Sequence, residues 1–228
     1  MAVEHCAMIR THSGRSLAAA LSASLLGVSL LTGAEIRVED FEGTEMRFSF
    51  FAGDEFPGAK GRLVQEKLDA GNGKAARLDA DFAGGGVYVQ MGMDLDPPIE
   101  VTELRFRFKT RQVGKVRLRI SDSTGQVHQQ LLPAPASGNW QDMKVTQFTG
   151  GEDAMHWGGA NDGVWHSPAT GIAFLLEKDQ LLGKTGTLWL DDVRAAGSQV
   201  TRLELAFLQQ KPGNVFLGGE PFEWSTLR

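Results

Sequence analysis

The sequence is poor in cysteine, tyrosine and basic residues. Its 228 residues include one cysteine, Cys6, and one tyrosine, Tyr88, and 28 acidic residues outnumber 23 lysines and arginines, which gives a net charge of −5. A single cysteine excludes an intrachain disulfide and a cysteine-rich zinc site. An acidic chain also lacks the basic surface of a non-specific nucleic-acid-binding protein, so we expect no nucleic-acid partner.

Helical periodicity and long apolar runs are also scarce after residue 34. The sequence is 42% hydrophobic and 22% charged, which is typical of a folded globular protein and not of a disordered one. Glycine is abundant, with 28 residues, and it separates many short runs in which apolar and polar residues alternate. This pattern predicts an all-β protein.

The first 34 residues have the features of a secretory signal peptide. Arg10 and Arg15 precede an apolar run over residues 17–31, and residues 32–34 (TGA) are the short residues that favour cleavage after residue 34. We therefore expect a secreted or periplasmic mature protein that lacks the cysteine and has no membrane span. A retained anchor is the alternative, although the run is short for one.

Short strands are predicted along most of the remaining chain. Apolar and cationic residues alternate over residues 104–109 and again over 116–120, and Gly114 lies between the two runs, so we expect a hairpin with one buried and one cationic face. Further strands are predicted at residues 45–52, 62–68, 75–82, 86–92, 126–132, 140–147, 171–177, 187–194 and 200–208. Strands of this number and spacing indicate a β-sandwich, specifically a jelly roll.

Three motifs add a family resemblance to this prediction. They are residues 38–43 (VEDFEG), 139–145 (NWQDMKV) and 188–193 (LWLDDV), in that order along the chain. Together they resemble the galactose-binding-like β-jelly-roll fold of carbohydrate-binding modules found at the N-terminus of secreted glycoside hydrolases. The resemblance covers roughly residues 36–196. It implies a non-catalytic module that binds a polysaccharide or oligosaccharide, with the catalytic domain of a glycoside hydrolase as a further partner.

The same resemblance implies a structural calcium ion. In that family the first and last strands lie together, and a calcium often sits where they meet. Carboxylate and carbonyl oxygens are the ligands that Ca²⁺ prefers. The candidate ligands, as side chains or backbone, are Asp40, Glu42, Asn72, Lys74, Asp191 and Asp192. The alternative is that these residues belong to turns and strand ends that hold no metal.

The chain divides into three predicted segments. Residues 1–34 are the signal peptide, residues 35–197 the jelly roll, and residues 198–228 a separate segment. Within that last segment, residues 213–221 (GNVFLGGEP) are similar to the entry of a second β-sandwich in larger secreted glycoside hydrolases. Residues 198–228 are therefore either the truncated start of a second domain or a strand added to the first.

A long stretch over residues 149–170 has no strand pattern, and long loops inside compact domains are commonly functional. Sugar binding needs flat aromatic faces together with polar groups for the hydroxyls. The loop offers both, in Trp157, Trp165, His156, His166, Asp162 and Asn161. The alternative is that the two tryptophans fix the loop to the sandwich. Trp140 and Trp189 lie in predicted strands, so we expect them in the core.

A row of cationic residues comprises Arg105, Arg107, Lys109, Arg117 and Arg119. One interpretation is a solvated outer face of the sheet. The other is a groove for uronate or sulfated sugars, because arginine binds carboxylates with two parallel hydrogen bonds.

Signals for catalysis are weak. No carboxylate pair of the kind that glycosidases use is evident, and no nucleophile motif or phosphate-binding loop is present. His128, in the polar run QVHQQ, is expected to be a surface residue. We therefore predict a protein that is not an enzyme. An interaction or structural β-sandwich without a sugar site is the alternative function, and an unrecognised lyase or esterase on a jelly roll is a further one.

Overall fold

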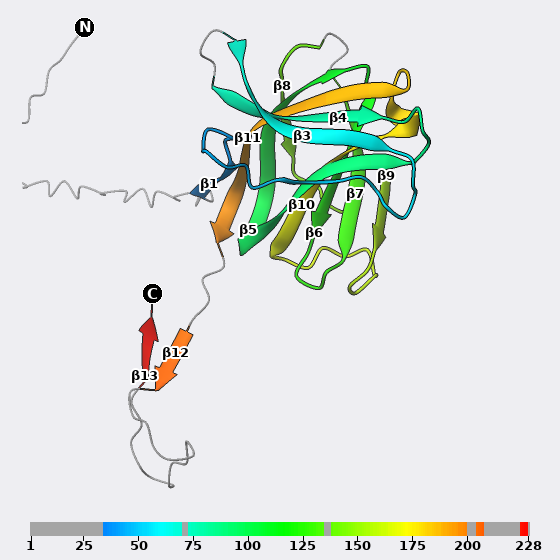
Figure 1. The fold of residues 1–228 in the computed structure, drawn as a ribbon. Coiled ribbons are helices and arrows are strands. Elements are labelled where there is room, and N and C mark those ends of the chain that lie inside the picture. Colours follow the sequence, from blue (N-terminus) through cyan, green and yellow to red (C-terminus); the bar gives the residue numbers. More distant parts are fainter. Residues whose placement is uncertain (1–33, 70–72, 135–137, 200–203, 208–223, 228) are drawn as a thin grey trace, which may run out of the picture. The chain divides into compact units, whose positions relative to one another are not determined.

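The computed structural model describes residues 34–69, 73–134, 138–199, 204–207 and 224–227 (Figure 1). Most of the expected signal peptide, the candidate calcium ligand Asn72 and the 213–221 motif lie outside the described residues. No helix within the described ranges is both long and apolar enough to cross a membrane.

The regular secondary structure of the described residues is almost entirely β, as the sequence predicts, and every strand pairing among them is antiparallel. The elements are β1 (Ala34–Glu39), β2 (Ser49–Phe51), β3 (Lys60–Lys67), β4 (Lys74–Asp81), β5 (Tyr88–Arg111), β6 (Lys115–Ser121), β7 (Val127–Pro133), β8 (Gln141–Val145), β9 (Glu152–Trp157), β10 (Ala169–Glu177), the short 3-10 helix η2 (Lys178–Gln180), β11 (Thr185–Gln199), β12 (Glu204–Phe207) and β13 (Trp224–Leu227).

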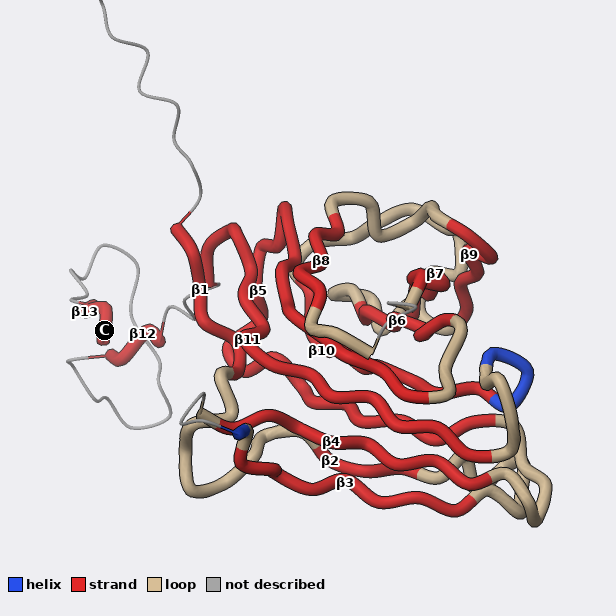
Figure 2. The backbone as a smooth tube through the Cα atoms, turned by 90° about the horizontal axis from the view of Figure 1, so that it is seen from above, coloured by secondary structure: helices blue, strands red, loops and turns tan. Residues whose placement is uncertain are grey.

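The 24-residue strand β5 links two layers of a β-sandwich. Its first part, residues 88–94, pairs with β2 and β10, and its last part, residues 101–111, pairs with β11 and β8. The first layer consists of β3, β4, β11, the end of β5, and β8, and β1 pairs with the second half of β11. The second layer consists of β2, the start of β5, β10, β6, β7 and β9. In Figure 2, β3 and β4 lie at the lower side of the molecule, and β6, β7 and β9 lie at the upper right.

The core lies between the two layers and is rich in phenylalanine. Phe106 of the first layer packs edge-on against Phe174 of the second, with ring centroids 4.8 Å apart. Phe48, in the segment before β2, lies 6.2 Å from Phe174 and 5.7 Å from Phe41. Full burial of such a side chain is worth roughly 1.5–3 kcal/mol. A disulfide-free domain of this size therefore has a substantial core to hold its two layers together.

The predicted hairpin between residues 104–109 and 116–120 is wrong. Both runs are strands, but residues 104–108 pair with β8 and β11 in the first layer, whereas β6 pairs with β7 and β10 in the second. Alternation reveals that a strand has one buried face, but it carries no information about the neighbouring strand. The cationic row is consequently divided between two opposite faces of the sandwich.

The stretch over residues 149–170 is not irregular throughout, because it contains β9, which pairs with β7 at the edge of the second layer. All six residues of β9 are exposed, so the strand lacks the apolar–polar alternation that identifies half-buried strands. The true loop begins after Trp157 and ends before β10. Trp157 is therefore the last residue of strand β9 and does not belong to the loop.

The last described residues form a two-stranded sheet in which β12 pairs only with β13. The strand predicted at residues 200–208 thus includes β12. β11 extends to Gln199, two residues beyond the predicted end of the jelly roll. The choice between an added strand and the start of a second domain stays a prediction.

Candidate functional site

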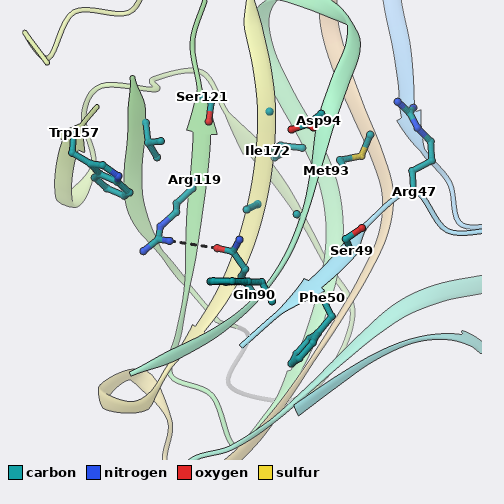
Figure 3. Close-up of a pocket in the computed structure, with 15 residues that line it drawn as sticks. Arg47, Ser49, Phe50, Gln90, Met93, Asp94, Arg119, Ser121, Trp157 and Ile172 are labelled. Atoms are coloured by element: carbon teal, nitrogen blue, oxygen red, sulfur yellow. Dashed lines mark hydrogen bonds between the residues drawn. The ribbon is translucent and has the colours of Figure 1, made fainter. Parts of the chain in front are cut away.

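A groove of about 770 Å³ lies on the outer face of the second layer (Figure 3). It crosses the sheet from β2 to β9, and the strand register places Gln90, Gly92, Asp94, Arg119 and Ala173 together on the side opposite the core. The lining residues are Arg47, Ser49, Phe50, Phe51, Gln90, Gly92, Met93, Asp94, Arg119, Ser121, Val127, Trp157, Gly171, Ile172 and Ala173. The groove therefore combines exposed aromatic rings with hydrogen-bonding groups.

Small residues form the floor of the groove. Gly92 of β5 stands opposite Ala173 of β10, and Asp94 stands opposite Gly171. A Cβ atom on Gly92 would lie 3.0 Å from the Cβ of Ala173, whereas one on Gly171 would meet only ordinary contacts at 3.5 Å or more. A ligand can therefore approach the backbone of these two central strands closely.

A cation held between two aromatic rings lies at one side of the groove, and two of the three residues, Arg119 and Trp157, line it. The guanidinium carbon of Arg119 lies 4.8 Å from the ring centroid of Tyr88 and 5.0 Å from that of Trp157. These three residues come from β5, β6 and β9, so the row spans most of the second layer. Trp157 is 38% exposed. Its indole can consequently offer a flat apolar face to a ligand while its other contacts keep it in place.

Hydrogen bonds fix the Arg119 side chain further. Its Nε donates to Oε1 of Gln129 at 3.1 Å, and its Nη1 donates to Oε1 of Gln90 at 3.4 Å, the contact drawn as a dashed line in Figure 3. Both acceptors are neutral amides. The guanidinium is therefore oriented without being neutralised by them.

Besides its contact with Arg119, Tyr88 contacts residues 51–56. Its hydroxyl donates a hydrogen bond to Glu55, and its ring packs near Phe51 and Phe56 at centroid distances of 6.3 and 6.4 Å. Burial raises the pKa of Tyr88, and the bond to Glu55 raises it further. The same bond is the main reason why the pKa of Glu55 is lowered. Tyr88 is therefore a neutral, rigid hydrogen-bond donor whose hydroxyl is already occupied.

Arg117 lies two residues before Arg119 on the same face of β6, but its environment is different. It is 5% exposed, and its Nε and Nη2 each donate to Glu177 at 2.8 Å. Nη2 also donates to Oδ2 of Asp153 at 2.7 Å. Burial lowers the pKa of Arg117, but the two carboxylates outweigh it and raise the pKa overall. This cluster ties β9 to β6 and β10, so its role is structural.

Of the six predicted sugar-binding residues, only Trp157 lines this groove. Trp165 packs toward the core, 5.0 Å from Phe148 and 5.5 Å from His128 between ring centroids. His156 lies on β9 opposite His128, with ring centroids 6.4 Å apart. Trp157 is thus separated from Trp165 and His156, which lie on either side of His128.

The remaining three predicted residues shape the loop after β9. Asp162 accepts hydrogen bonds from the Val164 backbone at 2.9 Å and from the His166 ring at 3.0 Å. Asn161 adopts a left-handed conformation, with φ of 51°, and its backbone N–H closes a turn onto Gly158 at 3.0 Å. These hydrogen bonds all lie within residues 158–166, so they stabilise the turn itself.

A buried polar cluster anchors this loop. Asp122 and His128 are 0% and 1% exposed, so the prediction of a surface histidine is wrong. Asp122 accepts hydrogen bonds from Thr124 at 2.7 and 2.9 Å and from the Gln126 backbone at 3.1 Å. Gln126 in turn donates to the Val164 carbonyl at 2.8 Å. Burial raises the pKa of Asp122, but the hydrogen bonds from Thr124, Gln126 and His128 prevail and lower it to about 2.

The cationic residues of the first layer face the opposite side of the molecule. The guanidinium of Arg107 lies 4.7 Å from the Trp140 ring, and Lys109 Nζ lies 4.4 Å from the Trp189 ring. Trp189 is also covered by Arg77 at 5.6 Å. Trp189 is buried, as expected, at 8% exposed, but it lies under cations on the outer face of the first layer and not between the layers. Trp140 is only partly buried, so the expectation of a core position is wrong for this residue.

The candidate calcium ligands have other hydrogen-bonding partners. Lys74 Nζ donates to the carbonyl oxygens of Glu42 and Gly43 at 3.1 and 2.8 Å, and its backbone N–H donates to Glu42 Oε1 at 2.8 Å. The side chain of Asp40 accepts from Arg37 at 2.7 Å. The Lys74 ammonium therefore takes two of the oxygens that a cation would use.

Asp191 and Asp192 lie in the middle of β11, at an irregularity in its pairing with β5. Asp192 accepts a hydrogen bond from Arg194 at 2.7 Å. Burial raises the pKa of Asp191 to about 6, with a smaller contribution from the charges of Asp192 and Glu42, while Arg107 opposes the rise. Across the described residues, no three His, Asp or Glu side chains are grouped to hold a metal ion. Calcium binding stays a prediction.

Most residues that line the groove are not among those predicted from the sequence. Tyr88, Gln90, Gly92 and Asp94 alternate with apolar residues in the run VYVQMGMD, so the outward face of this strand could have been read from the sequence. What could not be read was that β5 and β6 are separated by β10, which brings Arg119 between Tyr88 and Trp157.

Comparisons with known proteins support the fold. No protein-family model and no curated protein sequence matches the chain significantly. Among solved structures, the family 11 carbohydrate-binding module of the cellulosomal cellulase Lic26A-Cel5E of Clostridium thermocellum is similar, with a TM-score of 0.52 and 15% identity, covering 73% of this chain and 96% of that module. The solution structure of CtCBM11 gives a TM-score of 0.50 and 15% identity, covering 75% of this chain and all but 1% of the other. The chain therefore has the β-sandwich fold of a carbohydrate-binding-module-like jelly roll.

Proposed function

We propose that this protein binds a polysaccharide or oligosaccharide in the groove of the second layer. The observation that carries the proposal is the 38% exposed ring of Trp157, which lies beside Arg119 in a groove with a floor of small residues. Sugar rings pack their C–H faces on aromatic rings and use their hydroxyls for hydrogen bonds. The groove offers both types of contact.

The proposed role is non-catalytic. Asp94 is the one carboxylate among the described residues that line the groove, whereas most glycosidases place two carboxylates on either side of the scissile bond. The similar module from Clostridium thermocellum belongs, by its name, to a cellulase. By analogy, this chain would hold a glycan for a secreted glycan-degrading enzyme, and the signal-like residues 1–34 would direct its export to the periplasm or the medium.

A structural or interaction domain without a sugar site is the second candidate. The observation that favours it is a set of exposed phenylalanines, Phe50, Phe51 and Phe56, at the β2 end of the groove. Exposed apolar residues that lie close together are common at protein interfaces. In that case another domain of the same glycan-degrading system would cover the groove.

A binding screen with two matched variants tests the proposal. The purified protein would be run in affinity electrophoresis through gels that contain neutral, uronate-rich or sulfated polysaccharides. Trp157→Ala removes the groove ring, whereas Met155→Ala changes the next outward residue of β9, which is 55% exposed and does not line the groove. Retardation that is lost only in Trp157→Ala supports carbohydrate binding. Retardation by none of the polysaccharides supports the interaction domain.

A further inference from the structure

We propose that the groove selects glycans that carry carboxylate or sulfate groups, and that Arg119 is the residue that recognises the anion. This inference rests on the proposed function, since it names the ligand class of the same groove. The observations that carry it are the charge balance around Arg119, the fixed position of its guanidinium and the other charges along the groove.

The first observation is that Arg119 has no acidic partner. Its two hydrogen-bond acceptors, on Gln90 and Gln129, are neutral amides. Across the part of the chain that the structure describes, no carboxylate oxygen lies within 4 Å of its guanidinium. Glu55 acts on Arg119 only as a weaker, longer-range charge, since its carboxylate is engaged by the Tyr88 hydroxyl.

Arg117 shows what a purely structural arginine looks like in this sheet. It lies on the same face of the same strand, and both a bidentate bond to Glu177 and a bond to Asp153 neutralise it. The two arginines thus differ in whether carboxylates neutralise the guanidinium, which decides whether it can bind an anionic ligand. Of these two arginines, Arg119 is the one whose charge is available to a molecule in the groove.

The second observation is that the guanidinium is held in place before any ligand arrives. The rings of Tyr88 and Trp157 lie 4.8 and 5.0 Å from it, and two amide oxygens fix its orientation. Figure 3 shows the side chain on the groove wall between Trp157 and Gln90. A planar guanidinium binds carboxylate and sulfate oxygens through paired N–H donors, and a pre-oriented one loses less entropy when it does so.

The third observation concerns the remaining charges of the groove. Arg47, at the opposite wall, donates from Nη1 to the Val38 carbonyl at 2.9 Å, and none of the carboxylates in the described ranges pairs with it. Asp94 is the single described acid that lines the groove. Cations therefore outnumber acids along the lining, although the whole chain carries a net charge of −5.

Isothermal titration with three tetrasaccharides tests the inference. The probes are tetragalacturonate, which carries carboxylates, a sulfated galactan tetrasaccharide and neutral cellotetraose. At low salt we expect at least one acidic probe to bind about tenfold or more tightly than cellotetraose, and this preference to shrink as salt screens the charge. The stronger of the two acidic probes identifies whether the anion is a carboxylate or a sulfate.

Variants then assign the preference to Arg119. We expect Arg119→Gln to weaken binding of the acidic probe about tenfold or more, and by a larger factor than it weakens cellotetraose binding, with Arg119→Lys in between. Arg62→Gln is the matched control, because it removes one exposed arginine outside the groove. If Arg119→Gln fails to fold, the parent and Arg119→Lys are compared instead. An acidic preference that shrinks with salt and is weaker in Arg119→Lys supports the inference, and one that neither salt nor the variant changes contradicts it.

Two results would overturn the inference and can be told apart. Equal or tighter binding of cellotetraose, or an acidic affinity that Arg119→Gln does not change, would refute the anion preference and leave carbohydrate binding intact. Binding of no glycan among these probes and the wider polysaccharide panel would refute the proposed function itself.

Discussion

The ring of Trp165 lies 5.0 Å from the ring of Phe148, and this contact fixes the loop after β9 to the core. Trp157 contacts Arg119 on the exposed face of the sheet instead. The two tryptophans of one sequence stretch therefore have different roles, one in stability and one in the groove.

The first prediction follows from this difference. Trp165→Ala removes a partly buried ring and leaves a cavity, so the free energy of unfolding should fall by about 2–3 kcal/mol, near the lower end for large aromatic truncations. Trp157→Ala should cost about 1 kcal/mol or less, because the ring is partly solvated and its main partner is a cation. Urea unfolding of both variants checks this. An equal loss for the two would contradict the separation of roles.

The floor of the groove gives a second prediction. Ala173→Leu places a larger side chain over the centre of the groove, where Gly92 and Gly171 leave open space. Binding of any glycan that the parent retains should fall about tenfold or more, while the melting temperature should change little. Ala83→Leu, at an exposed loop position outside the groove, is the control and should leave both quantities unchanged. Unchanged binding by Ala173→Leu would place the ligand elsewhere.

The third prediction concerns acid stability. The pKa of Asp122 is about 2 in the folded protein, below the ordinary value of 3.8. Its contribution to stability is therefore present above pH 4 and is lost as the pH falls through about 2, because the unfolded chain takes up the proton first. At about 1.4 kcal/mol per pKa unit, the contribution is about 2 kcal/mol.

Urea unfolding between pH 2 and 5 measures this contribution. Asp122→Asn should be less stable than the parent at pH 5 and should lose less stability than the parent on acidification. A parallel pH dependence for the two proteins would show that Asp122 is not the responsible group.

Calcium supplies a fourth prediction. If the acids near β11 hold Ca²⁺ together with groups outside the described residues, a free calcium concentration a hundredfold above Kd should stabilise the fold by about 2.7 kcal/mol. Melting curves with calcium and with a chelator measure this, and Asp191→Asn should abolish the difference. An identical melting temperature in both conditions would contradict calcium binding and would leave the carbonyl oxygens of Glu42 and Gly43 to Lys74 and Gln65.

The class of fold could be predicted from local sequence, and most strand positions with it. Residues 104–109, for example, have a strict alternation whose apolar members are buried in the core. Strand neighbours could not be predicted, because pairing depends on contacts between segments far apart in the chain. This is why residues 104–109 and 116–120 are joined in the sequence prediction and separated in the structure.

The candidate site was predicted only in part for the same reason. Trp157 was singled out by its residue type, but its partner Arg119 comes from another strand and is identified only by the sheet order. Trp165, His166 and Asp162 have residue types typical of sugar binding, yet local hydrogen bonds and packing account for them. Residue type indicates what a side chain can do, and burial decides which of those contacts it makes.

Binding of a glycan in the groove of the second layer can be observed residue by residue. It is tested most directly by ¹H–¹⁵N spectra of the protein, titrated with whichever glycan the binding screen identifies. If a glycan binds in this groove, chemical-shift changes will concentrate on Gly92, Arg119, Ala173 and the indole N–H of Trp157. Changes that cluster instead on Trp140 and Trp189, on the outer face of the first layer, would contradict it.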